Sequence, residues 1–476
     1  MTYNEIQKTG RLWLCAGMLA IKLIYILTTS LMLPDINLLW PYDKNICLDN
    51  IVFELIPFLA AVLIYVYLYR RGNMYSYFTS VFFIIFFIPV NSSLSLSSYE
   101  PDYFILSNLF SILLLLILGN IAAADQSKNP QACVSGEQMT ENLLFSNPVY
   151  VWIFRGAMIL VCILTLYYVY KYNGINFAIL TSQMYSVRSD YAEYAVSIQG
   201  TTASYLTLII TGAGRWFLPV YLYFALTRKN AADTIICLFT IVANYTVEMQ
   251  KSSLFIILVV LFVVRLNQTR KLHLAGEKWV GFFVILLAAS CAEYAVTKDS
   301  VIYQVIIRRL MYVPNYMTHT YYAFFKNNQK IWFTQDAFII QWFMRAVLKR
   351  PYEGSTVQVI SANCFSGLLP SPNTGIFAEA YAQMGIAGVF VFPIINGLVI
   401  RWIGESSRTF GEGIPLVVLS RMGFTFINNF TLASSILIGV CIFVFTANVI
   451  GKMSEKAFST AAHQNEEIIW QTNLYR

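Results

Sequence analysis

The stretch WVGFFVILLAASCAEYAVTKDSVIYQVIIRRLMYVP, residues 279–314, passes from a nearly continuous apolar run into a polar, aromatic-rich segment. The apolar run covers 278–297, about the 20 residues that a helix needs to cross a bilayer. The polar segment extends from Lys298 to Gly375. Long segments of this kind are more often functional than structural, and its aromatic content argues against disorder. The sequence therefore predicts a membrane protein whose functional site lies in this segment.

The composition of the whole chain agrees with a membrane location. Of 476 residues, 57% are hydrophobic and 12% are charged, and the mean hydropathy is +0.59. These values are typical of a polytopic membrane protein and exclude a soluble globular domain. The net charge of +7 is assigned to cytoplasmic loops rather than to nucleic-acid binding. The eight cysteines are scattered without a CxxC pair, so they are interpreted as small buried hydrophobic residues.

Twelve apolar runs predict an all-α bundle of about twelve transmembrane helices. They cover residues 11–33, 51–69, 75–97, 103–124, 149–170, 203–227, 233–247, 252–267, 278–297, 376–402, 413–430 and 431–450. The two runs within 233–267 are short and lie close together. The predicted organisation is an N-terminal bundle (1–297), a large outer segment (298–375), C-terminal helices (376–450) and a tail (451–476).

Positive charge is unevenly distributed over the short loops. With the N-terminus inside, most Lys and Arg residues of these loops are cytoplasmic, as the positive-inside rule requires. Both termini are then cytoplasmic, and the loop 173–203 and the segment Lys298–Gly375 face the periplasm or the cell exterior. Within that segment, residues 301–328 have helical apolar spacing and are predicted to lie flat at the membrane interface. Residues 337–348 predict a second amphipathic helix.

Charged side chains inside apolar runs are candidate functional residues, because each costs about 2.5 to 3.5 kcal/mol at the centre of a spanning helix. Arg215 lies in the middle of a predicted span, and Lys251 lies between the two short runs. The alternative is that such residues form structural pairs inside the bundle, as Lys251 could with Glu248. Lys22 and Arg155 are interpreted as structural, or as reaching the interface with their long side chains.

The doublet Arg308-Arg309 is a candidate phosphate-binding site. Guanidinium groups bind phosphate through paired hydrogen bonds, and the doublet is predicted at the depth of a lipid pyrophosphate headgroup. Arg188 in the outer loop and Arg215 would add positive charge on the same side. The alternative is a simple interfacial anchor to anionic lipid.

His319 and Glu379 are candidate general bases. His319 follows Arg308 by eleven residues, close to three helical turns, so the two are expected on one face of a helix. Glu379 lies in the first turns of the next predicted span, where it could accept a proton, hold a sugar hydroxyl or pair with a loop arginine. The chain has no nucleotide-binding motif, and too few His or Cys residues lie in the outer segments for a metal site.

Two stretches resemble the bacterial oligosaccharide repeat-unit polymerases, the Wzy-type enzymes of O-antigen and capsule synthesis. RRLMYVPNYMTHTYYAFFKNN, from Arg308, is similar to an R-x-x-x-x-P…Y-Y-x-x-F pattern. SPNTGIFAEAYAQMGIAGVFVFP, from Ser371, is similar to an N-x-G…A-Y-x-x-x-G-x-x-G pattern, and EMQKSSLFIIL around Lys251 to a short K-S segment. The patterns are carried by Arg309, Pro314, Tyr321, Tyr322, Phe325, Asn373, Gly375, Ala380, Tyr381, Gly385 and Gly388.

The resemblance implies a GT-C-like helical bundle and a glycosyltransferase reaction. The growing glycan would be transferred from its polyprenyl pyrophosphate to the non-reducing end of a new repeat unit, without metal, nucleotide or other cofactor. The hypothesis that we draw from the residues themselves is that Arg308 or Arg309, with Arg188 and Arg215, holds the pyrophosphate, and that Glu379 or His319 activates the acceptor hydroxyl. Further substrate contacts are expected from Arg188, Arg215, Lys251, Tyr312, Tyr321, Asn373 and Tyr381.

Two other functions stay open at this point. A glycan ligase also uses a lipid-pyrophosphate donor and a large outer loop, in which an arginine and His319 would carry catalysis. A secondary transporter or flippase is indicated by the short paired runs within 233–267 and by the intramembrane charges. For the polymerase, the expected location is the bacterial inner membrane. Its expected partners are the lipid-linked donor and acceptor, membrane lipid and a chain-length regulator protein.

Overall fold

The computed structural model confirms an all-helical fold in the part of the chain that it describes. The described residues are 3–32, 48–70, 73–96, 100–128, 148–173, 206, 209–248, 251–269, 271–337, 340–365, 374–406, 413–428, 439, 441–446 and 448–449. Every regular element in these ranges is a helix. The predicted outer segment contains helices too, over 301–327 and 340–347, close to the two amphipathic stretches identified from the sequence.

Within the described residues, eight helices are long and apolar enough to cross a membrane, as expected of a polytopic membrane protein. They are Gly10–Met32, Asn50–Leu68, Met74–Asn91, Pro101–Asp125, Pro148–Lys171, Ile209–Thr227, Leu272–Thr297 and Ile386–Glu405. Each overlaps a predicted span. Three further predicted spans appear only as shorter apolar helices, Ala231–Thr246, Phe255–Gln268 and Gly413–Gly423. The last predicted span, 431–450, lies mostly outside the described residues.

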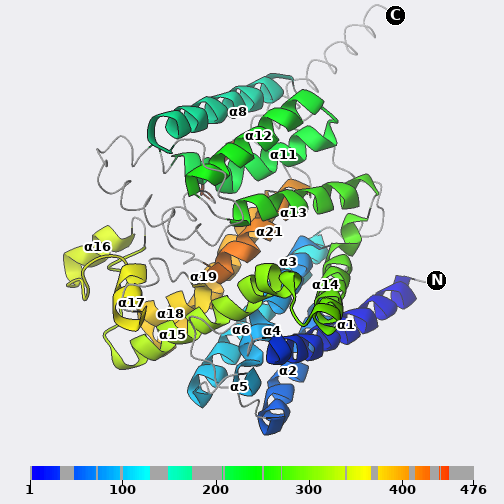
Figure 1. The fold of residues 1–476 in the computed structure, drawn as a ribbon, viewed down its shortest axis with the longest axis vertical. Coiled ribbons are helices and arrows are strands. Elements are labelled where there is room, and N and C mark those ends of the chain that lie inside the picture. The colour runs from blue at the N-terminus through cyan, green and yellow to red at the C-terminus, as the bar shows by residue number, and fades with distance from the viewer. Residues whose placement is uncertain are drawn as a thin grey trace, which may run out of the picture. The chain divides into compact units, whose positions relative to one another are not determined.

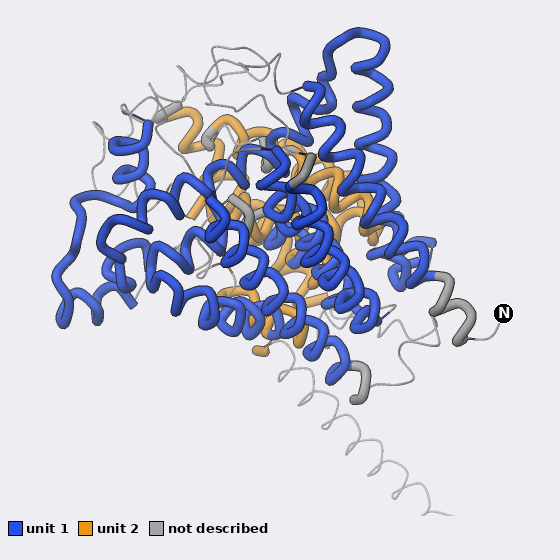
Figure 2. Tube along the Cα trace, turned by 90° about the horizontal axis from the view of Figure 1, so that it is seen from below, with its two compact units in different colours: residues 1–136, 265–401, 419–437 blue, residues 137–264, 402–418, 438–476 orange. Residues whose placement is uncertain are grey.

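The chain forms two compact units that interleave along the sequence (Figure 2). Unit 1 comprises Met1–Gly136, Arg265–Arg401 and Leu419–Leu437, and unit 2 comprises Glu137–Val264, Trp402–Val418 and Ile438–Arg476. The predicted N-terminal bundle, 1–297, therefore contributes helices to both units.

Unit 1 contains the N-terminal helices and the helices of the outer segment. Its elements are α1 (Tyr3–Met32), α2 (Leu48–Leu68), α3 (Met74–Phe82), η1 (Phe83–Phe87), α4 (Ile88–Asn91), α5 (Ser93–Leu96), α6 (Pro101–Lys128), η4 (Leu272–Leu274), α14 (Ala275–Thr297), η5 (Tyr303–Tyr312), α15 (Val313–Asn327), α16 (Ile340–Val347), α17 (Thr356–Phe365), α18 (Ile376–Met384), most of α19 (Ile386–Glu405) and part of α21 (Gly413–Asn428). Helix α1 packs along α14, α2 along α6, and α15 against α18 (Figure 1).

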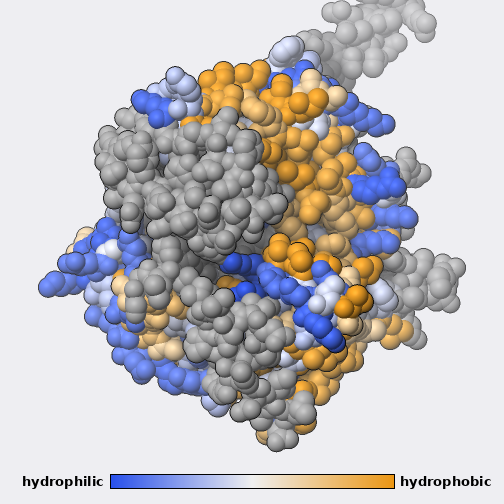
Figure 3. Space-filling view, viewed as in Figure 1, coloured by the Kyte–Doolittle hydropathy of each residue, from blue (hydrophilic) through white to orange (hydrophobic). Residues whose placement is uncertain are grey.

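Unit 2 contains two helices, α8 (Pro148–Tyr168) and α12 (Ala231–Glu248), that expose large apolar side chains. Its elements are α8, η2 (Val169–Asn173), η3 (Ala213–Phe217), α11 (Leu218–Thr227), α12 and most of α13 (Lys251–Gln268). Helix α12 packs between α8 and α11. Trp152, Ile153 and Ile235 are 69%, 63% and 66% exposed, and Figure 3 shows apolar residues gathered over α8 and α12. Exposed apolar area on this scale marks a lipid-facing surface.

Three helices widen into a π-helical turn just before a proline. Pro89, Pro219 and Pro314 each stand two residues after the π segment, namely η1, η3 and η5. A proline cannot donate to the carbonyl four residues back, and its ring crowds that carbonyl. The helix accommodates this with i→i−5 bonds upstream, such as Val313 N–H to Arg308 O. Such turns often occur at functional sites, and η3 and η5 carry Arg215 and the Arg308-Arg309 doublet.

The predicted span 376–402 is interrupted, because α18 ends at Met384 and α19 begins at Ile386. Gly385 between them has φ +60°, a conformation that glycine adopts without strain. Three residues later, Gly388 has no side chain, so the backbone of α19 can approach the backbone of α18 directly. A Cβ on Gly388 would lie 2.0 Å from the carbonyl oxygen of Ala380. The two glycines of the A-Y-x-x-x-G-x-x-G pattern thus have a structural role at this junction.

Gly388→Ala is expected to lower the free energy of unfolding by about 3 kcal/mol or more, because the new methyl group meets backbone that cannot rotate away. Unfolding of the purified full-length protein in detergent by urea measures the change. The matched control is Gly156→Ala in α8, where nothing lies within 4 Å of the new Cβ. There, helix propensity predicts a gain of up to about 1 kcal/mol. Equal effects at the two positions would contradict the close helix contact.

Candidate functional site

Segments η5 and α15 form one continuous helix that carries three of the predicted site residues. Arg308 and Arg309 lie on η5, and His319 lies on α15. The helix was predicted to lie flat at the membrane interface. Part of its apolar surface packs against protein, since Tyr303, Ile307 and Met311 are fully buried. Because it is packed, the helix holds its polar residues in fixed positions.

The two arginines differ in exposure. Arg309 is exposed, and Arg308 is half-buried with its Nε covered by protein. The prediction that Arg308 and His319 share a helix face assumed 3.6 residues per turn throughout. That premise is wrong, because η5 makes i→i−5 bonds up to Arg308 O and so uses more residues per turn. An exposed guanidinium on a rigid helix can reach a phosphate outside the packed core.

His319 lies in an aromatic and acidic environment where α15 meets the start of α6. Its ring stands edge-on to the ring of Tyr103, with centroids 5.0 Å apart and an interplanar angle of 83°. The hydroxyl of Tyr103 donates to Asn315 Oδ1 at 2.8 Å, four residues before His319 on the same helix. Tyr103 also packs on Tyr322, with centroids 5.4 Å apart. These contacts hold the ring of Tyr103 in place and thereby restrict the position of the His319 imidazole.

Burial sets the protonation state of His319. Loss of water lowers the pKa of the imidazole to about 4, although the carboxylates of Glu100 and Asp102 act to raise it. The ring is therefore neutral at neutral pH. A neutral imidazole can accept a proton, which is required of a general base.

Two carboxylates near His319 were missed from the sequence. Glu100 and Asp102, at the start of α6, both form ion pairs with Lys326 on α15, the latter at 2.6 Å. Hydrogen bonds to Asp102 and Glu100 raise the pKa of the Lys326 ammonium, so it stays charged. All three side chains keep more than a third of their surface exposed. Acidic residues around Pro101 do mark a helix start in the sequence, but no local signal indicates their partner, which lies more than 220 residues away.

Helix α18 brings Tyr381 and Glu379 to the same region of unit 1. Tyr381 packs on Tyr322 with ring centroids 4.5 Å apart, and the ammonium of Lys330 lies 5.0 Å from the Tyr381 ring centre. Glu379 is fully buried in the first turn of α18, where the helix dipole stabilises negative charge. The hydroxyls of Thr318 and Thr374 join α15 to the start of α18 at 2.8 Å.

The three tyrosines predicted to line a sugar path are covered by protein in this conformation. Tyr312, Tyr321 and Tyr381 are 3%, 1% and 6% exposed. They pack the core between α15 and its neighbours, as amphipathic aromatic residues commonly do. Near His319, the side chains of Glu100, Asp102 and Lys326 are more exposed than these three tyrosines.

The other predicted substrate contacts lie outside the described residues or in unit 2. Arg188 and Asn373 lie outside the described residues. Lys251 is the first residue of α13, and its side chain is likewise outside what the structure describes. Arg215 is half-buried on η3, which belongs to unit 2.

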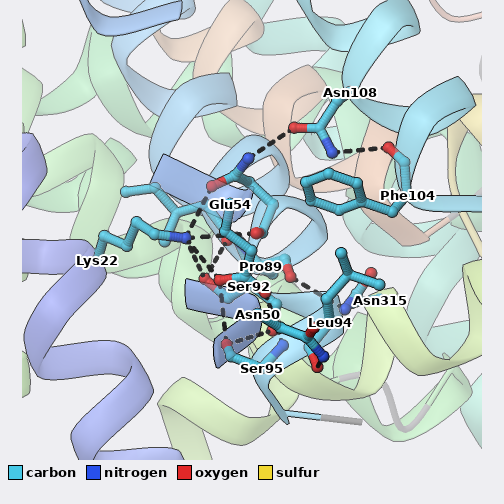
Figure 4. Close-up of polar contacts among 12 residues, drawn as sticks. Lys22, Asn50, Glu54, Pro89, Ser92, Leu94, Ser95, Phe104, Asn108 and Asn315 are labelled. Atoms are coloured by element: carbon cyan, nitrogen blue, oxygen red, sulfur yellow. Dashed lines mark hydrogen bonds and ion pairs between the residues drawn. The ribbon is translucent and has the colours of Figure 1, made fainter. Parts of the chain in front are cut away.

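A second polar cluster lies wholly inside unit 1 (Figure 4). The ammonium of Lys22 on α1 donates to Glu54 Oε2 at 3.1 Å, Asn91 Oδ1 at 2.7 Å and Ser92 Oγ at 3.2 Å. Lys22 and Glu54 are both fully buried. Glu54 also accepts the backbone N–H of Ser95 at 2.7 Å, at the break between α4 and α5. Lys22 therefore does not reach toward the interface but forms a structural pair.

Arg155 forms the corresponding pair in unit 2. Its guanidinium lies 2.9 Å from Asp233 Oδ2, which links α8 to the first turn of α12. The interpretation of Lys22 and Arg155 as structural residues is thus supported by their partners.

Comparison with known proteins identifies no relative, since no family model, curated protein or solved structure matches the chain. The resemblance to repeat-unit polymerases therefore stays a proposal that depends on the residues and contacts described above.

Proposed function

We propose that the chain is a membrane glycosyltransferase that polymerises polyprenyl-pyrophosphate-linked repeat units into O-antigen or capsular polysaccharide. The observation that carries this proposal is the helix formed by η5 and α15. It combines an arginine doublet, one residue of which is exposed, with a half-buried, neutral His319 beside two carboxylates. Phosphate binding and proton acceptance are the two tasks that such a transfer requires.

In the proposed reaction, Arg309 and Arg308 hold the pyrophosphate of the donor and stabilise the charge that develops as it leaves. The bond between the donor sugar and the pyrophosphate oxygen breaks, and a new glycosidic bond forms to the acceptor hydroxyl. The proton of that hydroxyl passes to a base, and polyprenyl pyrophosphate is released.

His319 is the favoured base for the acceptor hydroxyl, because its ring is neutral and less buried than Glu379, although its Nε2 is covered by protein in this conformation. Glu379 is fully buried in this conformation, so its use as a base would require α18 to move. Glu100 and Asp102 have exposed oxygens that can accept hydrogen bonds from sugar hydroxyls while Lys326 balances their charge.

We also propose how the chain is oriented in the membrane. Twelve spans in a GT-C-like arrangement, with both termini cytoplasmic, would put residues 298–375 on the periplasmic side of a bacterial inner membrane. A chain-length regulator protein is the proposed partner, and the lipid-linked donor and acceptor are the proposed substrates.

The lowered pKa of His319 predicts how transfer depends on pH. The neutral, base-competent form predominates above the folded-state pKa of about 4, so the rate should not fall from about pH 8 to about pH 5 on account of this group. It should decline only as the pH approaches that pKa. Initial transfer rates in proteoliposomes measure the profile. A step near the usual histidine pKa that disappears in His319→Gln would contradict the buried, neutral state.

A second candidate function is transport of a lipid-linked glycan across the membrane. The observation that favours it is the Lys22–Glu54 pair, which sits at the interruption between α4 and α5. Interrupted helices with buried charges are common at the substrate and ion sites of transporters. Both candidates use the same class of lipid substrate, so a cellular assay can separate them.

The experiment is a gel profile of surface polysaccharide from a deletion strain and from the complemented strain. A ladder that collapses to a single repeat unit on the lipid A core, and is restored by the wild-type gene, supports the polymerase. Loss of even that single unit would favour a flippase or a ligase. An unchanged ladder would exclude all three functions in that pathway.

A further inference from the structure

Helix α16 presents an apolar surface to its surroundings. None of its side chains is buried, and Trp342, Phe343 and Val347 are 73%, 71% and 81% exposed. The helix lies at the edge of unit 1, beyond α17 (Figure 1). Large aromatic and aliphatic side chains at this level of exposure are unfavourable in water.

The side of α16 that the protein partly covers carries Gln341 and Met344, which are half-buried, whereas Arg345 is exposed. Arg345 Nε donates to the backbone oxygen of the buried Thr334 at 2.7 Å, and its Nη2 donates to Gln341 Oε1 at 3.3 Å. Arg345 therefore has hydrogen-bond partners at the protein surface, while the large apolar side chains of the helix are left outside. That arrangement suits a helix whose outer neighbour is apolar.

The segment that leads into α16 is fixed at the start of a candidate membrane span. Ile331 N–H donates to Ala382 O at 2.9 Å, at the end of α18. The ring of Phe333 stacks on Phe392 of α19, with centroids 5.9 Å apart and the planes 1° from parallel. Because α19 begins at Ile386 and is long enough to cross a bilayer, α16 is tethered near the level where that span starts.

The segment before α16 contains three residues with strained backbone, which indicates that the surrounding contacts hold this segment firmly. Trp332, Phe333 and Asp336 have φ values of 49°, 61° and 56°, in the left-handed region that side chains disfavour. Gln383 accepts the N–H of Phe333 at 2.6 Å, and Asp336 Oδ2 accepts that of Thr356 at 2.7 Å. Strain of this kind persists only where the surrounding contacts impose it, typically where a segment has a function.

We propose that α16 is a membrane-surface anchor, whose side chains Trp342, Phe343 and Val347 insert between the headgroups and acyl chains of an anionic phospholipid bilayer. The exposed Lys349, just after the helix, would face the headgroups. A second copy of the chain is a poorer occupant. A stable protein interface buries about 1,200 to 2,000 Å², more than one eight-residue helix offers. The anchor does not depend on the proposed function.

The test places a photoreactive benzophenone amino acid at position 343 or 347 of the full-length protein, reconstituted in nanodiscs that contain radiolabelled phospholipid. The matched control positions are Gln341, on the protein-facing side of the same helix, and the exposed Glu353. Positions 343, 347 and 353 are exposed and position 341 is half-buried, so the folding of each variant is checked by gel filtration. After irradiation, label should attach to the protein at 343 and 347 several times more than at 341 and 353.

A second arm tests the headgroup charge. Lipid labelling at position 347 should be about fivefold higher with phosphatidylglycerol than with phosphatidylcholine alone, and Lys349→Gln should abolish that difference. Equal labelling at all four positions would overturn the anchor, as would cross-linking of positions 343 and 347 to a second copy of the chain. Equal labelling in the two lipids would overturn the role of anionic headgroups.

Discussion

Arg309→Ala is expected to abolish long polysaccharide while single repeat units are still made and displayed. The loss of one preorganised donor to a developing oxyanion typically slows catalysis by about 100- to 1,000-fold, enough to remove the ladder from a gel. Arg309 is the sharper choice of the doublet, because its side chain is exposed and Arg308 is half-buried. Its replacement therefore removes charge and hydrogen-bonding capacity with little loss of packing. The gel profile of the complemented deletion strain is the measurement.

Two variants make this result specific. Arg309→Lys keeps the positive charge but loses paired hydrogen bonding, so it should give a shortened ladder between the two extremes. Lys278→Ala removes an exposed cation from α14 in the same unit and should leave the ladder unchanged. Protein levels in the membrane fraction must be equal throughout. If Arg309→Ala still produces full-length polymer, Arg309 does not have the proposed role of holding the donor pyrophosphate.

Lys22→Met is expected to lower the free energy of unfolding by about 3 to 5 kcal/mol, the usual cost of leaving one charge of a buried pair alone. The ammonium of Lys22 would no longer neutralise Glu54, which is fully buried and would keep only the hydrogen bonds of Ser95. Methionine has a similar length, so the loss of packing is small. Urea unfolding of the full-length protein in detergent measures the effect.

The double variant Lys22→Met/Glu54→Gln separates charge from packing. With both charges removed, the free energy of unfolding should recover by more than half of the loss in Lys22→Met. Lys278→Met is the control, since an exposed lysine should change stability by no more than about 0.5 kcal/mol. If the double variant is as unstable as Lys22→Met alone, uncompensated charge is not the cause. If the double variant cannot be expressed, Glu54→Gln alone gives a second measurement of the pair.

The sequence predicted those parts of the fold that depend on the residues of a single segment, such as an apolar run or a helical spacing of apolar residues. Eight of the twelve predicted spans correspond to helices long enough to cross a membrane, because a bilayer requires a run of apolar residues that is visible in the sequence. The helix over Tyr303–Asn327 was likewise visible in its apolar spacing. Its π-helical turn was not anticipated, although Pro314 stands two residues after it and is its physical cause.

The candidate site was only partly predictable. Arg309 and His319 were identified from their residue types within a polar segment, whereas Glu100, Asp102 and their partner Lys326 were missed. The ion pairs that join them connect α6 to α15 across more than 220 residues. Residue type alone also suggested that Tyr312 and Tyr321 face a substrate, but both are buried in the core.

The sequence by itself determined that this protein is helical and embedded in a membrane, because hydropathy and helical period are properties of short segments. Only the tertiary structure decided which helix faces meet. It pairs Lys22 with Glu54, brings Gly388 against the Ala380 carbonyl and leaves Trp342 and Phe343 of α16 exposed. The physical reason is that an apolar run can pack equally well against lipid or against another helix. The choice depends on shape and hydrogen bonds between segments far apart in the chain.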